Sequence, residues 1–190
     1  MSLAPSLRRP VVAAIAGAAV LSCGLAAGAA AAAAPKTVNA TRITRPAGTL
    51  APGSNVNASR IFGQRTFTSA TRGFALATVG QAQYPVATTN GGTTWKTNGP
   101  ALHLDAAQAP LSISFIGAVN RNTIYAWGGG QVIDTTNNGG KTWYRALFTT
   151  GSPVAVVSDL TGHLLAFVQS FNGSSSVKYT SKNGGRTWKR

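Results

Sequence analysis

TTNGGTTW, residues 88–95, is the stretch that decides the fold of this chain, because it occurs three times. It recurs as TNNGGKTW at 136–143 and as SKNGGRTW at 181–188. The shared pattern is [ST]-x-N-G-G-x-T-W, and its tryptophans follow one another after 48 and then 45 residues. A period of this length is typical of the blades of radial β-repeat proteins. The chain is therefore a repeat protein with three copies of one unit.

Each copy of the pattern is predicted to be a hairpin turn that belongs to the scaffold. Asn tolerates a positive φ and accepts bonds from backbone N–H groups, and two glycines remove the Cβ penalty where the chain reverses. The Thr favours a strand, and the indole covers the turn. A repeated residue serves every unit, whereas a catalytic site is built once. The scaffold positions are Asn90, Gly91, Gly92, Trp95, Asn138, Gly139, Gly140, Trp143, Asn183, Gly184, Gly185 and Trp188.

Two apolar, β-prone runs precede each turn, for example RTFTSA and RGFALATV in the first unit. Each unit therefore predicts a four-stranded antiparallel meander, with units at about 61–100, 108–148 and 152–190. The predicted fold is all-β, with three blades of a β-propeller-like array. Three blades are fewer than the four to eight that close a ring. Two chains pairing into a ring, an open array and a shortened relative of a longer propeller all remain open.

The turn motif resembles the Asp-box, or bacterial-neuraminidase, repeat, whose pattern is S-x-D-x-G-x-T-W, and more closely its T-x-[DN]-G-G-x-T-W form. The resemblance covers about 61–190 and extends to sialidase-like propellers, sortilin-type domains, some xyloglucanases and photosystem II assembly-factor-like proteins. It implies a propeller whose boxes lie at the outer hairpins, away from the ligand-binding channel. Asn stands at all three Asp positions, which keeps the hydrogen-bond acceptor and removes the charge. The motif is specific for fold and uninformative about function.

The first 34 residues are predicted to be an export signal. Arg8 and Arg9 precede an uncharged, Ala-rich run over 11–34, in the order expected of a signal peptide. We expect cleavage within 29–34, with an uncleaved anchor as the alternative. Cys23, the one cysteine, follows VLS and resembles a loose lipoprotein box, so lipid attachment there is a second alternative. The expected location is the extracellular space or the cell envelope.

Residues 35–60 are predicted to be a flexible linker. Two prolines and two glycines interrupt the stretch from 36 to 60, and it lacks apolar periodicity. The alternative is that residues 41–44 lend one strand to the fold. If the leader is cleaved, the mature chain has no transmembrane segment.

Lys and Arg number 17 against 3 Asp and no Glu, which gives a net charge of +14. The bases are spaced singly through the sequence rather than gathered in a stripe, so we predict no dedicated nucleic-acid site. A sialidase-like site would need a glutamate base, and a two-carboxylate glycosidase would have to use Asp105, Asp134 or Asp159. His103 and His163 lie in different units without companion ligands. We therefore predict no catalytic site, no cofactor and no metal.

The sequence thus favours an exported, non-catalytic binding or interaction module with an unknown ligand. Its partner is predicted to be a second copy that closes a ring, or a cell-surface polymer or protein. The alternatives are a divergent or degenerate glycoside hydrolase and an assembly factor for a membrane complex. Aromatic rings combined with arginines suit both sugars and anionic groups. The candidate contacts are Arg72, Tyr84, Arg121, Tyr125, Trp127 and Arg145.

Overall fold

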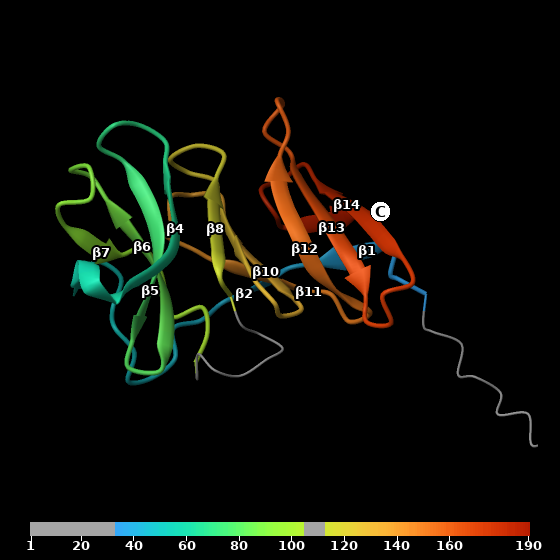
Figure 1. Ribbon diagram of the computed structural model, residues 1–190, viewed down its shortest axis with the longest axis horizontal. Helices are drawn as coiled ribbons and strands as arrows, with labels where there is room; N and C mark the ends of the chain where they lie inside the picture. Colours follow the sequence, from blue (N-terminus) through green and yellow to red (C-terminus); the bar gives the residue numbers. More distant parts are fainter. Residues whose placement is uncertain (1–32, 105–112) are drawn as a thin grey trace, which may run out of the picture. The chain divides into compact units, whose positions relative to one another are not determined.

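The computed structural model describes residues 33–104 and 113–190, which form three antiparallel sheets (Figure 1). Their one helical element is a short 3-10 turn, η1, over Ala58–Arg60. The all-β, propeller-like fold class is confirmed, although each sheet has five strands instead of the expected four. The predicted leader up to residue 32, Cys23 and Asp105 lie outside the described residues.

Each blade is a meander of four consecutive strands to which one strand of the N-terminal arm is added. The first blade contains β4 (Ile61–Phe67), β5 (Gly73–Val79), β6 (Ala82–Thr88) and β7 (Trp95–Thr97). The second contains β8 (Phe115–Ala118), β9 (Ile124–Trp127), β10 (Val132–Thr136) and β11 (Tyr144–Leu147). The third contains β12 (Gly151–Ser158), β13 (Leu164–Ser170), β14 (Ser176–Ser181) and β15 (Thr187–Lys189).

The N-terminal arm pairs with all three blades, which corrects the prediction of a flexible linker over 35–60. Strand β1 (Thr37–Asn39) pairs with β15, β2 (Thr41–Arg42) with β11, and β3 (Asn55–Val56) with β7. The arm thus follows the outer edges of the blades in reverse order. Pairing satisfies backbone groups that an exposed edge would leave open. A two-residue strand carries too little side-chain periodicity to be read from sequence.

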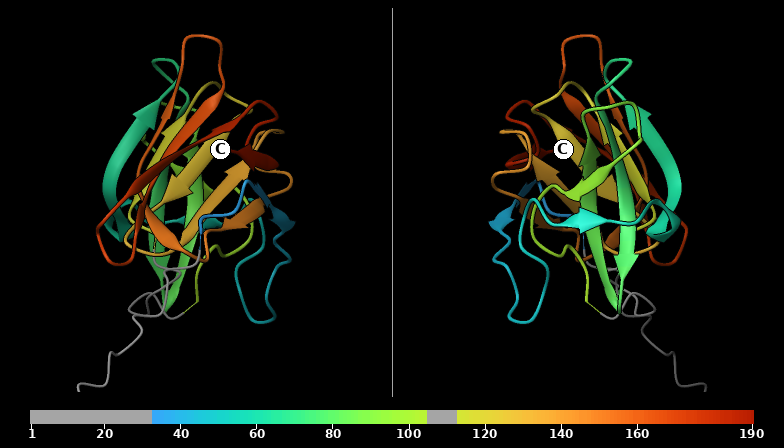
Figure 2. Two further views of the ribbon diagram at one scale, coloured as in Figure 1. Left: turned by 90° about the vertical axis from the view of Figure 1, so that its right-hand side faces the viewer. Right: turned by 90° about the vertical axis from the view of Figure 1, so that its left-hand side faces the viewer.

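The three blades stack face to face in a row, and Figure 2 views this row from its two ends. Phe74 and Leu76 of the first blade share an apolar core with Trp143 of the second. Tyr125 and Ile133 of the second blade share another core with the third blade. Each sheet therefore buries apolar side chains on every face that meets a neighbouring blade, as stacked sheets do.

The three Asn-Gly-Gly turns have one common hydrogen-bond pattern. In the second blade, the amide of Thr142 donates to Oδ1 of Asn138 at 2.9 Å, and the hydroxyl of Thr136 donates to the same oxygen. The amide of Gly140 donates to the Thr136 hydroxyl at 3.1 Å. Equivalent bonds occur in the first and third turns. The predicted acceptor role of the Asn is confirmed, and the preceding Thr or Ser has an additional role as a bridge.

The paired glycines serve the contact between blades as well as the turn. Gly139 and Gly140 have φ of +73° and +95°, which side chains rarely adopt. A Cβ at Gly140 would overlap Asn98 of the first blade, and a Cβ at Gly185 would overlap Thr135 of the second. The turn of one blade therefore rests directly against the blade before it.

Replacing Asn138 with Ala is expected to lower the free energy of unfolding by about 1 to 2 kcal/mol, because the Thr142 amide and Thr136 hydroxyl lose their acceptor. N138D keeps this acceptor and makes its bonds charge-assisted, so we expect it to be at least as stable as the parent. Urea denaturation of both variants measures the difference. Equal losses in the two variants would show that the amide oxygen has no such role.

Candidate functional site

Three aromatic side chains of β8 and β9 form a stacked row, here called the aromatic platform: Phe115, Trp127 and Tyr125. The rings of Phe115 and Trp127 are 5.1 Å apart and inclined by 25°, and those of Tyr125 and Trp127 are 5.8 Å apart at 26°. Phe115 is 46% exposed, whereas Tyr125 is buried. The row therefore leads from the interior to a flat, half-exposed ring that an apolar ligand face can stack against.

The buried end of the platform is fixed in place by its neighbours. Gly117 lies opposite Tyr125, and a Cβ there would overlap the Tyr125 ring. Burial raises the pKa of the Tyr125 hydroxyl, and a hydrogen bond with Ser158 opposes that rise. Since Tyr125 also belongs to the core between the second and third blades, the platform has a rigid base.

The predicted contacts do not gather at one place. Arg121 is exposed in the turn between β8 and β9, at the opposite end of this hairpin from Trp127. Arg72 lies half-buried in the equivalent turn of the first blade, with its guanidinium carbon 5.6 Å from the Phe74 ring. Tyr84 is buried in the first blade, and its hydroxyl accepts a bond from the Leu50 amide of the arm. Of the six candidates, only Tyr125 and Trp127 lie side by side.

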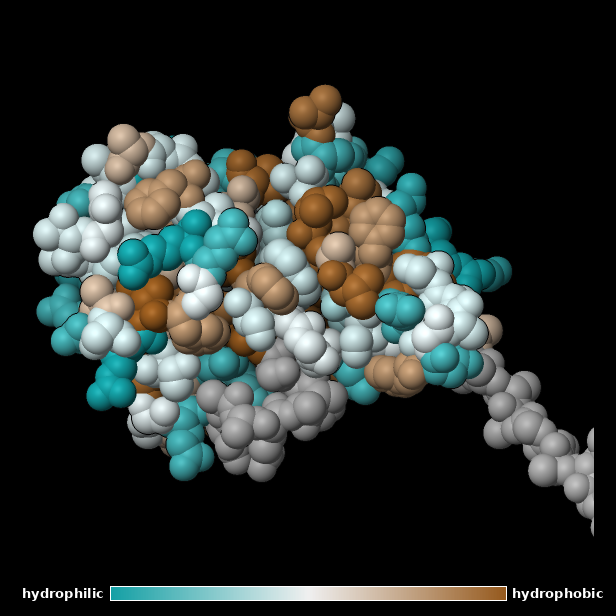
Figure 3. Space-filling view, in the orientation of Figure 1, coloured by the Kyte–Doolittle hydropathy of each residue, from teal (hydrophilic) through white to brown (hydrophobic). Residues whose placement is uncertain are grey.

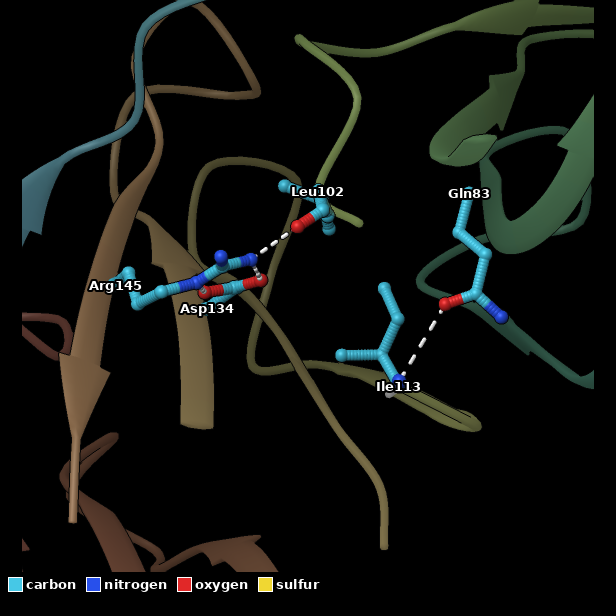
Figure 4. Close-up of polar contacts among 5 residues, drawn as sticks. All are labelled: Gln83, Leu102, Ile113, Asp134 and Arg145. Carbon is cyan, nitrogen blue, oxygen red and sulfur yellow. Dashed lines mark hydrogen bonds and ion pairs between the residues drawn. The ribbon is translucent and has the colours of Figure 1, made fainter. Parts of the chain in front are cut away.

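Arg145 is engaged inside the second blade, which corrects its prediction as a surface contact (Figure 4). It lies directly across the strand pair from Asp134, with Nε 2.8 Å from Oδ1 and Nη2 2.7 Å from Oδ2. The Asp134 side chain is fully buried. Burial raises the pKa of the Asp134 carboxyl, and the contact with Arg145 opposes that rise. The guanidinium is thus committed to a buried, bidentate ion pair.

The ion pair also holds the segment that leaves the first blade. Nη2 of Arg145 donates to the carbonyl of Leu102, as Figure 4 shows. His103 next to it is buried, and its Nε2 has no hydrogen-bond partner among the described residues. Asp134 therefore links β10, through Arg145, to residues 101–104. Its burial and pairing are those of a structural carboxylate.

Asp159 and His163 both take part in the hydrogen bonds of the turn between β12 and β13. The Thr161 hydroxyl donates to Oδ1 of Asp159 at 2.6 Å, and the His163 amide donates to the same oxygen at 2.9 Å. These hydrogen bonds, with that of Thr161 first, lower the pKa of the Asp159 carboxyl. Within the described ranges, no three His, Cys, Asp or Glu side chains gather in a way that could hold a metal ion.

Phe115 is the platform residue that the sequence-based prediction missed. The turn at residues 119–123 sets the register of β8 and β9, with Ala118 opposite Ile124 and Phe115 opposite Trp127. Counting outward from the Asn-Arg-Asn turn would have found this pair. The stacking itself is a property of the sheet, because directly opposite residues lie within side-chain reach.

Three stacked antiparallel sheets, of which the second and third each place a tryptophan-bearing turn against the blade before it, define a β-propeller-like repeat protein whose described blades form an open row. A scan against protein-family models finds no match, and a search of curated proteins finds none. Among solved structures, the chain is similar to "YCF48 bound to D1 peptide", with 19% identity and a TM-score of 0.47. The match covers 77% of this chain and 46% of that one, so the chain spans less than half of that protein's length.

Across residues 33–104 and 113–190, no helix has the length and apolar character needed to cross a membrane.

Proposed function

We propose that this protein is an exported, non-catalytic interaction module of the cell envelope or extracellular space, and that it binds a cell-surface polymer through the aromatic platform. The observation that carries the proposal is the half-exposed Phe115 ring stacked on Trp127. Flat aromatic rings at a sheet edge suit the apolar face of a sugar ring. Export rests on the signal-like residues 1–34.

The chemistry of the described residues supports a binding role over a catalytic one. Asp134 is buried and paired with Arg145, and Asp159 accepts bonds from its own turn. A two-carboxylate mechanism needs one group to release a proton and the other to attack or activate water. Asp134 has no access to solvent, whereas Asp159 is 32% exposed at its side chain but uses its Oδ1 within its own turn. A degenerate glycoside hydrolase is therefore the weaker alternative, and an assembly factor would require a membrane-protein partner.

Tryptophan fluorescence offers a direct test. Trp95, Trp143 and Trp188 are buried, whereas Trp127, which belongs to the platform, is half-buried. We expect soluble glycan fragments, screened as neutral glucans, peptidoglycan fragments and sialylated oligosaccharides, to shift the emission of Trp127. Replacing Phe115 with Ala should weaken the binding of the responding glycan about tenfold, on the scale of a single stacking contact.

Phe167 provides the matched control, since it is an exposed phenylalanine of another blade. F167A should leave glycan binding unchanged, and W127F should abolish the fluorescence signal. The absence of any emission change over the whole panel would argue against the platform as a glycan site. Release of reducing sugar from any of these compounds would instead favour the hydrolase.

A further inference from the structure

The outer face of the third blade, here called the end face, is exposed and apolar. Side chains of β12 and β13 alternate, so that Val156 and Ala166 lie in the core toward the second blade. Their neighbours Val157 and Phe167 are 44% and 37% exposed on the opposite face, and Val154 at the bulge is 56% exposed. Figure 3 shows hydrophobic side chains gathered over this part of the molecule.

Within the row, the equivalent face of the second blade receives the turn of the third. A Cβ at Gly184 would come within 2.7 Å of Asn137, and one at Gly185 would overlap Thr135. The guanidinium of Arg186 lies 3.8 Å from the centre of the Tyr144 ring. A glycine turn followed by a cation therefore fits this position, because the aromatic ring attracts the positive charge.

The end face has a corresponding place for a turn, but the side chains around it favour a negative charge instead of a positive one. Alignment of the repeats puts Lys182 where the second blade has Asn137, and Lys189 where it has Tyr144. These two lysines border a shallow hollow of about 220 Å³, together with Thr180, Asn183 and Thr187. Two ammonium groups would repel a turn that carries Lys or Arg and would attract one that carries a carboxylate.

A second copy of this chain fits the end face poorly. The turns that carry Lys141 and Arg186 already pack against the preceding blades of the same chain, and the first turn, residues 90–93, carries no carboxylate. The outer face of its first blade is covered by the arm: Leu50 packs against the core there, and the amide of Gly53 donates to the Thr97 carbonyl at 2.8 Å. Pairing two end faces would bring Lys182 and Lys189 of both copies to one interface. Like charges oppose such a contact.

We propose that the end face docks a second, acidic protein, which presents a tight glycine-containing turn bearing Asp or Glu to the lysines and apolar side chains to Val157 and Phe167. The contact continues the stacking of the row with a partner blade or hairpin in place of a fourth blade. Apolar area supplies the affinity, and the charges select the partner. The end face is separate from the aromatic platform, so this inference does not depend on the glycan proposal.

Two hairpin peptides derived from the third turn provide the test. Both contain residues 179–188, closed by a disulfide between cysteines added at the ends; one keeps the natural sequence and the other carries K182E and R186E. Fluorescence anisotropy with the purified protein should show binding of the acidic hairpin at least tenfold tighter than that of the natural one. Its affinity should fall as salt is raised, since screening weakens exposed charge contacts.

Variants of the protein locate the contact. The double variant K182E/K189E should lose the preference for the acidic hairpin, and F167S should weaken its binding without reversing the preference. The matched control K96E/R121E makes the same change in net charge at exposed sites elsewhere and should bind like the parent. Equal affinity of the two hairpins, or an equal loss in the control, would overturn the proposal. Sedimentation that finds a dimer broken by F167S would assign the end face to a second copy instead.

Discussion

Replacing Trp143 with Ala is expected to lower the free energy of unfolding by about 3 to 5 kcal/mol, the range for a fully buried aromatic side chain. Trp143 is 0% exposed and belongs to the core shared by the first and second blades. Its Nε1 donates to the Asn98 carbonyl of the first blade at 2.8 Å. The substitution therefore opens a cavity between two blades and leaves a carbonyl without its donor. Guanidinium denaturation measures the loss.

The three repeat tryptophans differ in the hydrogen bond that their indole Nε1 makes. Nε1 of Trp95 donates to Gly92 of its own turn at 2.9 Å, whereas Nε1 of Trp188 has no partner among the described residues. W188F should therefore cost less than W143F, because phenylalanine removes a hydrogen bond only at position 143. If W143A costs less than about 1 kcal/mol, the centre of the range for point mutations in general, the indole does not anchor one blade to the next.

Replacing Arg145 with Ala is expected to cost about 3 to 5 kcal/mol at neutral pH, because it leaves the Asp134 carboxylate buried without its partner. Asp134 is fully buried, and Arg145 supplies both of its close hydrogen bonds from a side chain. The double variant D134V/R145L removes both charges and should be closer to the parent in stability. R121A at an exposed site is the control, with an expected change within about 0.5 kcal/mol.

The pH dependence of the Arg145 variant has a defined sign. Burial raises the pKa of the Asp134 carboxyl, and without Arg145 nothing among its observed partners opposes that rise to the same extent. A carboxyl with a higher pKa in the folded state favours folding at low pH and opposes it above the folded pKa. R145A should therefore be least destabilised in acid and lose stability as the pH rises toward neutral. A constant difference from the parent across this range would mean that Asp134 stays charged throughout or is not buried.

The repeat motif accounts for most of what sequence reasoning predicted correctly. An Asn followed by two glycines specifies a turn locally, through its own acceptor and the positive φ values that glycine tolerates. The alternating apolar runs before it specify strands, and the threefold repetition implies three similar sheets. These signals depend on residues close together in the sequence, so they can be recognised without the tertiary structure.

The arm and the candidate site were harder to predict, for one physical reason. Strands β1, β2 and β3 exist because each meets the open edge of a blade, and nothing in their own composition marks them as strands. Arg145 looks like a surface base until Asp134 is placed opposite it. Phe115 becomes a binding candidate only when the register puts it beside Trp127.

The sequence by itself determined the repeating unit, its turn chemistry and the scarcity of catalytic acids, because these follow from residue identity and local backbone preference. Only the tertiary structure decided which sheet faces are covered and which charged side chains form ion pairs. Asp134 and Arg145 neutralise each other inside the second blade, while Lys182 and Lys189 remain exposed on the end face. Burial and partnership depend on residues distant in the chain, and those are brought together by the stacking of the blades.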